Sequence, residues 1–226
     1  MDLSNNIIGF EGAQSICEAL QTNITLTSLN LTSNGLGDGG AKSIFEALKT
    51  NSTLTSLDLS SNKIYDVNSI CELFQSNFTL RSLDIGSNLI GDDSAQAICE
   101  LLKSSSILTS LDLNSNQIGY KTVKSICEIL KSNSTLTYLD LGCNKIRDVG
   151  SILICEALKL NSTLTSLDLF DNDIGDDGAK SIFESLKTNS ALTSLDLTSN
   201  NIGSNSVRSI CESLKSNSAL TNLDLG

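Results

Sequence analysis

The chain of 226 residues repeats one phrase at a nearly constant interval. LTSLDLSSNKI at 54–64 returns as LTSLDLNSNQI at 108–118 and as LTSLDLTSNNI at 192–202. A ninth copy begins at 220–226, and every step between neighbouring copies is 28 residues except the third, which is 26. The asparagine of the phrase falls at Asn6, Asn34, Asn62, Asn88, Asn116, Asn144, Asn172 and Asn200. Self-similarity at this period indicates a fold built by stacking eight copies of one supersecondary unit.

The phrase L-x-x-L-x-L-x-x-N resembles the leucine-rich-repeat signature. Its 28-residue period is similar to that of ribonuclease inhibitor and of the repeat domains of NOD-like receptors. The resemblance covers residues 1–226 and implies an α/β fold in a single domain. That fold is a right-handed leucine-rich-repeat solenoid, a horseshoe with a concave parallel β-sheet and convex α-helices. Because this fold serves many unrelated partners, the resemblance specifies architecture more closely than function.

One repeat can be interpreted physically from its own residues. Leu29 and Leu31 alternate with polar residues, which predicts a short strand with both leucines on one face. Ile44, Phe45 and Leu48 follow at helical spacing, which predicts an amphipathic helix. One unit cannot bury its own apolar face, so neighbouring units must stack. Strands stack at about 4.8 Å and helices at roughly 8–10 Å, so the stack must curve with its strands inside.

The turn between strand and helix carries two further signals. Gly37 falls where the chain must turn and suits a positive φ. Asp38 follows it and is predicted to be the N-cap of its own helix. The same column continues as Asp66, Asp92, Asp148, Asp176 and Ser204. Phe10 and Tyr120 interrupt that column.

Two asparagine columns are predicted to be structural. The asparagine of the repeated phrase should turn its amide inward and bond the backbone of neighbouring loops, since a buried amide needs such partners. Five of the six N-x-S/T sequons fall in one column after the helix, so the repeat explains them without glycosylation. The six are Asn23, Asn30, Asn51, Asn77, Asn133 and Asn161.

Six of the seven cysteines occupy one helical column, in which Phe45 and Phe183 take the remaining places: Cys17, Cys71, Cys99, Cys127, Cys155 and Cys211. Exchange with phenylalanine indicates a buried apolar position. Adjacent helices are too far apart for a disulfide, and no C-x-x-C pair suggests zinc. Cys143, outside the column, is expected at the concave side or its edge. Unpaired thiols are typical of a reducing compartment.

Composition excludes several classes of function. Histidine is absent and the formal net charge is -11. Ser-His-Asp catalysis, Cys-His catalysis and imidazole metal sites are therefore excluded. Nucleic acid and anionic membranes both need a basic face and are not expected partners. No apolar run approaches the roughly 20 residues of a membrane span, and no signal sequence is visible. We expect a cytoplasmic protein that is not an enzyme, has no catalytic residue and holds no metal or cofactor.

The strand position between the two core leucines is acidic in every copy except the second, which carries Asn30: Asp2, Asp58, Asp84, Asp112, Asp140, Asp168, Asp196 and Asp224. Because they alternate with leucine, these side chains should point away from the core as a file of carboxylates about 4.8 Å apart. One interpretation is that aspartate and serine simply solvate the sheet. The other is that the file attracts a basic protein partner to the concave face.

Larger side chains interrupt the small polar residues of the concave face. Tyr138 replaces serine in the sixth strand phrase, Phe170 follows the seventh, and Arg81 replaces threonine. Exposed aromatic side chains in such places are candidate binding anchors. The predicted partner-binding set joins these three to the nearest acids, Asp112, Asp140, Asp168, Asp171 and Asp196.

Irregular features modify this repeat in three places. The sequence predicts that Ile152 and Leu153 project outward from their helix. It also predicts that the two-residue deletion between Asp66 and Ser69 compresses a loop. Both ends of the chain fall halfway through a phrase and lack the polar cap that solenoids need. We expect a fragment of a longer array, with end-to-end self-association as the alternative.

The sequence favours a protein–protein interaction scaffold that binds its partner on the concave face. Two alternatives stay open. GTPase-activating proteins for Ran are built from similar repeats, which suggests an accessory catalytic factor. A self-assembling structural repeat is the other alternative.

Overall fold

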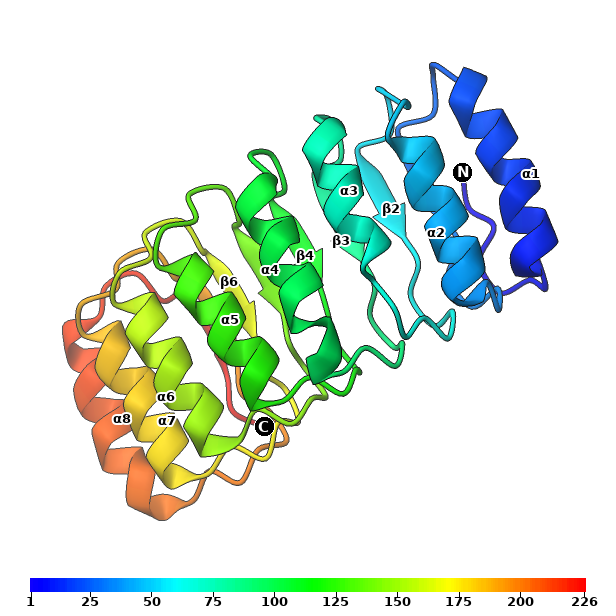
Figure 1. The fold of residues 1–226 in the computed structure, drawn as a ribbon. Coiled ribbons are helices and arrows are strands. Elements are labelled where there is room, and N and C mark those ends of the chain that lie inside the picture. The colour runs from blue at the N-terminus through cyan, green and yellow to red at the C-terminus, as the bar shows by residue number, and fades with distance from the viewer.

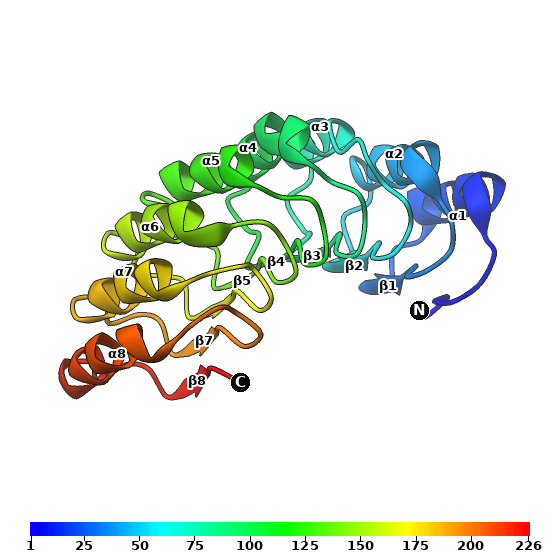
Figure 2. The ribbon, with the colours of Figure 1, turned by 90° about the horizontal axis from the view of Figure 1, so that it is seen from below.

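The computed structural model describes the backbone of residues 1–226 and all side chains except those at 70, 71, 74, 75, 95, 96, 99 and 104. The repeats stack side by side into a curved solenoid, with α1 at one end and α8 at the other (Figure 1). Seen from below, the strands follow the inner side of the arc and the helices its outer side (Figure 2). The predicted horseshoe architecture is confirmed.

A single parallel sheet forms the concave layer, and its eight strands lie in chain order. Each strand has three residues: β1 Ser28–Asn30, β2 Ser56–Asp58, β3 Ser82–Asp84, β4 Ser110–Asp112, β5 Tyr138–Asp140, β6 Ser166–Asp168, β7 Ser194–Asp196 and β8 Asn222–Asp224. The register never shifts, so equivalent residues of successive repeats are direct neighbours, as Asp112 and Asp140 are. Asp2 extends the sheet by a parallel bridge to Asn30.

The helices form the convex layer: α1 Gly9–Thr22, α2 Gly37–Leu48, α3 Ser69–Ser76, α4 Ala95–Ser104, α5 Tyr120–Leu130, α6 Arg147–Leu158, α7 Asp176–Leu186 and α8 Ser204–Ser216. A short 3-10 turn, η1 Asp92–Ser94, precedes α4. The shortened third repeat has the shortest α-helix, which begins only at Ser69, in agreement with the predicted compression. Within the described part of the chain, no helix has the length and apolar character needed to cross a bilayer.

The core lies between the two layers and is assembled from every repeat. Leu29 and Leu31 are buried behind β1, and Ile44, Phe45 and Leu48 are buried on α2, as predicted. Gly37 has the predicted positive φ. On α6 the prediction was half right. Ile152 is exposed, but Leu153 is partly buried and packs against the core.

Two asparagine ladders tie neighbouring repeats together. Asn62 donates from Nδ2 to the carbonyl of Leu31 in the preceding repeat at 2.9 Å and to Leu59 in its own at 3.0 Å. Its Oδ1 accepts the backbone N–H of Asn34 at 3.0 Å. In the second ladder, Asn51 donates to the carbonyl of Leu20 at 2.8 Å. Both columns therefore have the structural role predicted from the sequence.

The aspartates after the turn do not cap their own helices, contrary to the prediction from the sequence. Among the described residues, no helix receives a side-chain hydrogen bond from its own N-cap residue. Instead, Asp148 Oδ1 accepts the N–H groups of Gly175 and Gly178, at the start of α7, at 2.7 and 3.1 Å. Asp92 accepts from Gly119 and Thr122 at the start of α5 in the same way. The prediction failed because stacking brings N–H groups of the next repeat within reach, at Asp38, Asp92, Asp148 and Asp176. Asp66 instead accepts the N–H of Asn68 in its own repeat.

The cysteine column is buried at Cys17, Cys127 and Cys155, as predicted. Cys211, on α8, is exposed, which corrects the prediction; α8 has a neighbouring helix, α7, on one side. Cys71 and Cys99 have side chains outside the described set.

Candidate protein-interaction surface

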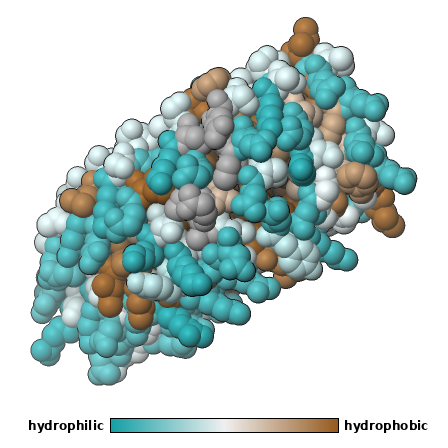
Figure 3. Space-filling model, viewed as in Figure 1, coloured by the Kyte–Doolittle hydropathy of each residue, from teal (hydrophilic) through white to brown (hydrophobic). Residues whose placement is uncertain are grey.

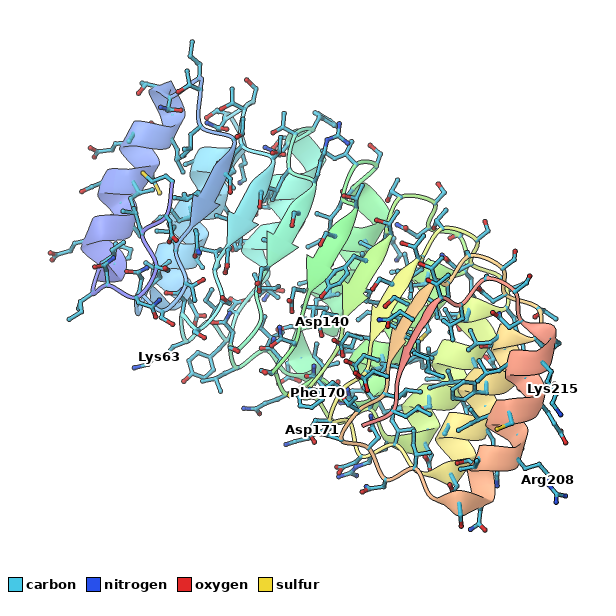
Figure 4. The ribbon with its side chains drawn as sticks, turned by 180° about the vertical axis from the view of Figure 1, so that it is seen from behind. Lys63, Asp140, Phe170, Asp171, Arg208 and Lys215 are labelled. Atoms are coloured by element: carbon cyan, nitrogen blue, oxygen red, sulfur yellow. The ribbon has the colours of Figure 1, made fainter. Side chains whose placement is uncertain are left out.

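The concave face consists of three parallel columns of side chains that alternate with the buried leucines. The first column is mostly serine and includes Tyr138, and the second is the aspartate file. The third, two residues beyond the aspartates, holds small residues except at Phe170. Figure 4 shows this face, where Asp140, Phe170 and Asp171 follow one another from the strands toward the loops. Register keeps each column continuous from repeat to repeat.

Each aspartate of the file is held by its own strand end. Oδ1 accepts the backbone N–H two residues later, from Asn114 to Asp112, Gly142 to Asp140 and Phe170 to Asp168, each at 2.8 Å. Oδ1 is thereby committed to the turn. At Asp112 and Asp168, Oδ2 is the atom available to a ligand. Because these bonds fix χ1, the carboxylates are positioned before any partner arrives.

Asp140 departs from the prediction that every carboxylate of the file points into solvent. Asp140 is only 8% exposed to solvent. The Tyr138 hydroxyl donates to Asp140 Oδ2 at 3.2 Å, which places the phenol over the carboxylate. A tyrosine can reach across two positions on one face of a strand, whereas the serine found elsewhere in this column cannot.

The pKa values in the middle of the file are raised. Burial raises the pKa of Asp84 to about 7, and the charge of Asp112 contributes to the increase. Burial likewise raises the pKa of Asp140 and that of Asp168 to about 6, against the hydrogen bonds from Gly142 and Phe170 that lower them. Desolvation and mutual repulsion therefore leave these carboxylates poorly compensated at neutral pH.

The predicted binding residues form a band across the sheet and not a single cluster. Arg81, exposed just before β3, lies at the same strand end as Tyr138. Phe170 lies four residues beyond Ser166, the register partner of Tyr138. Four residues of extended chain span about 13 Å, so the two aromatic residues flank the acids.

The remaining predicted residues complete this band. Asp196 is half-buried and accepts from the backbone N–H and the hydroxyl of Thr198 at 2.8 and 2.7 Å. Asp171 is exposed at the loop end, in a turn with a positive φ. Gly142, which the sequence analysis did not single out, lies beside Phe170. A side chain there would come within 3.1 Å of Asp140 Oδ1.

Stacked strand–helix units with a solvent-facing sheet define a solenoid of the binding-scaffold type. The sequence model described as Leucine Rich repeat matches this chain at residues 22–45, 50–67, 76–99, 104–127, 132–155, 160–183 and 188–211. The chain therefore belongs to the leucine-rich-repeat family. The family model does not distinguish the 28-residue class suggested by the sequence.

The fold is similar to that of solved bacterial repeat proteins. It is similar to an internalin C2 of Listeria monocytogenes str. 4b F2365, with 25% identity and a TM-score of 0.60 over 100% of this chain and 80% of that one. An internalin (inlF) of the same organism gives 25% identity and a TM-score of 0.56 over 91% and 63% of the two chains. A structure named Leiomodin-1 Actin-Binding Site 2 gives 30% identity and a TM-score of 0.44 over 46% of this chain and 61% of that one. A search of curated proteins finds no match.

Proposed function

We propose that this chain is a protein-recognition module and that its concave face binds a basic, helical segment of another protein. The observation that carries the proposal is the row of preset carboxylates on β3 to β7. Oδ1 of each accepts a backbone N–H, and Oδ2 is left for a ligand except at Asp140, where it accepts the Tyr138 hydroxyl. Family membership supports a protein-interaction module in general.

Charge favours a basic partner. The middle carboxylates are partly desolvated and repel one another, so a guanidinium or ammonium group laid across them relieves an existing penalty. Neighbouring strands are about 4.8 Å apart. Residues three or four apart on a helix are separated by about 5–6 Å. A helix lying across the strands can therefore offer one arginine to each of several successive aspartates.

Two aromatic side chains would contact such a segment on either side of the acids. Tyr138 lies at one end of the strand pair and Phe170 at the other, with Asp140 and Asp168 between them. Partly exposed aromatic groups supply contact area at a small entropy cost and are common binding anchors. We propose no catalytic role for this surface. The unpaired thiols favour a reducing compartment such as the cytoplasm.

The test uses a fluorescein-labelled amphipathic helical peptide with arginine at every third or fourth position. Fluorescence anisotropy should detect binding that weakens as salt is raised. Asp112→Asn combined with Asp168→Asn should weaken it about tenfold. The control, Asp93→Asn with Asp177→Asn, changes two exposed acids outside the concave sheet and alters net charge equally. Equal losses in both double variants would refute a concave site.

A further inference from the structure

A group of positively charged side chains lies on the convex side of this acidic protein. Lys121 and Lys124 are exposed on α5, and Lys145 and Arg147 are exposed at the start of α6. Among the described side chains, none of these four takes part in an ion pair. With a net charge of -11 over the whole chain, this local excess of cations is a distinct surface.

Tyr120 divides this surface into two open hollows, which we call together the Tyr120 groove. One, of about 510 Å³, is lined by Lys121, Lys124 and Ile129 of α5, together with Lys103 of α4. The other, of about 390 Å³, is lined by Lys145, Arg147 and Val149. Tyr120 lines both hollows and is 46% exposed, and Val149 is 57% exposed. Hydrophobic side chains gather over α6 in the space-filling view (Figure 3). The groove therefore combines cations with apolar contact area.

Three acids close to the groove are engaged with other groups. Glu128 Oε1 pairs with Lys131 Nζ at 2.8 Å. Asp148 Oδ1 accepts two N–H groups of the next repeat, at Gly175 and Gly178. Asp92 Oδ1 accepts from Gly119 and Thr122. Tyr120 itself stands in the column where five other repeats carry aspartate, so Glu128 lines the groove but the aspartate of this column does not.

We propose that the Tyr120 groove binds an acidic peptide segment of a second protein, with carboxylates on its lysines and arginine and a hydrophobic side chain against Tyr120 and Val149. Charge complementarity favours an acidic ligand, because four cations without ion pairs line the groove. The hydrophobic side chains beside them favour a peptide over a purely charged ligand. An extended polyanion fits less well. Single-stranded nucleic acid carries one charge per nucleotide along its whole length, and the acidic remainder of the protein would repel everything beyond the groove.

This surface is separate from the concave site in position and in charge. The concave file lies on the sheet, whereas the groove is lined by α5, by the start of α6 and by the loop residues just before these two helices. A chain with both surfaces can hold a basic and an acidic partner at the same time, as a bridging scaffold does.

The test uses a short fluorescein-labelled peptide of Glu and Asp around one central Phe, with binding followed by anisotropy. Lys121→Gln combined with Lys124→Gln should weaken binding about tenfold. The matched control, Lys180→Gln on α7 with Lys187→Gln just after it, removes the same charge elsewhere and should leave binding within about twofold.

Tyr120→Asp separates loss of binding from loss of folding. It places in this column the residue that five other repeats carry. The variant should therefore fold, which its urea midpoint checks, while losing the peptide. Three results would overturn the proposal: no binding to the parent chain, equal losses in both lysine variants, or tighter binding of a single-stranded oligonucleotide of equal charge.

Discussion

Replacing Asp140 by asparagine should stabilise the protein, although the carboxylate that it removes accepts two hydrogen bonds. The carboxylate is 8% exposed, and burial raises its pKa from 3.8 to about 6. A shift of about 2 units corresponds to about 3 kcal/mol of penalty on the charged form. Solvent screening within the open sheet reduces this to on the order of 1–2 kcal/mol.

The replacement should not disturb the local geometry. Asn30 occupies the same position in β1, where its Oδ1 accepts the N–H of Thr32 at 2.9 Å, as Asp140 accepts that of Gly142. An asparagine at 140 can also keep a hydrogen bond to the Tyr138 hydroxyl. The variant therefore removes the charge and retains the turn.

The sign of the pH dependence follows from the raised pKa. Above the folded pKa, both folded and unfolded chains carry the charge, and the folded chain bears the full penalty. As the pH falls through about 6 toward 4, the folded Asp140 takes up a proton before the unfolded one does, and the penalty disappears. The advantage of asparagine should therefore be largest near about pH 8 and less than half as large near about pH 4.5.

Urea denaturation of the parent and of Asp140→Asn at both pH values measures this difference without the ionic screening that guanidinium would add. Asp224→Asn is the control. Asp224 is exposed on β8, and its Oδ1 likewise accepts an N–H, from Gly226. A loss of stability at high pH in Asp140→Asn, or an equal gain in Asp224→Asn, would show that the file is not desolvated as described.

Three further changes test other parts of the structure. Asn62→Ala should lower the free energy of unfolding by at least about 3 kcal/mol, since it leaves several buried backbone groups unpaired, whereas the exposed Asn6→Ala should cost under about 1 kcal/mol; equal midpoints in urea would contradict the ladder. Asp148→Ala should cost about 1–2 kcal/mol by removing the acceptor at the start of α7, and amide hydrogen exchange should rise there first; unchanged protection of α7 would argue against capping between repeats. Tyr138→Ala with Phe170→Ala should weaken binding of the arginine peptide by at least about 2 kcal/mol in a calorimetric titration, with little change in thermal stability; unchanged affinity would remove these residues from the site.

Most of the fold could be predicted because each repeat has the same spacing of hydrophobic residues. Leu29 and Leu31 define the strand, and Ile44, Phe45 and Leu48 define the helix. Repetition of those spacings predicts stacking, and stacking predicts where the asparagine ladders lie. These inferences depend on periodicity within one unit, which the sequence displays directly.

The errors arose where a side chain acts on the next repeat. Asp38 was predicted to cap its own helix, yet its Oδ1 accepts the N–H groups of Tyr65 and Asp66, one repeat later. Burial of Asp140 depends on how far the Tyr138 phenol reaches along the strand. Both contacts require the spacing between stacked units, which no single repeat contains. The Tyr120 groove was signalled by a break in the aspartate column, but the break alone did not reveal the neighbouring cations.

The proposed concave site is tested most directly by carbon NMR of the aspartate side-chain carboxyls, recorded across pH with and without the arginine peptide. In the unbound protein, the carboxyls of Asp140 and Asp168 should titrate near pH 6 and that of Asp84 near pH 7. With the peptide bound, all three should titrate at lower pH, because a cation stabilises the charged form. Ordinary titration near pH 4 in the unbound protein, or carboxyl signals that the peptide leaves unchanged, would contradict the account.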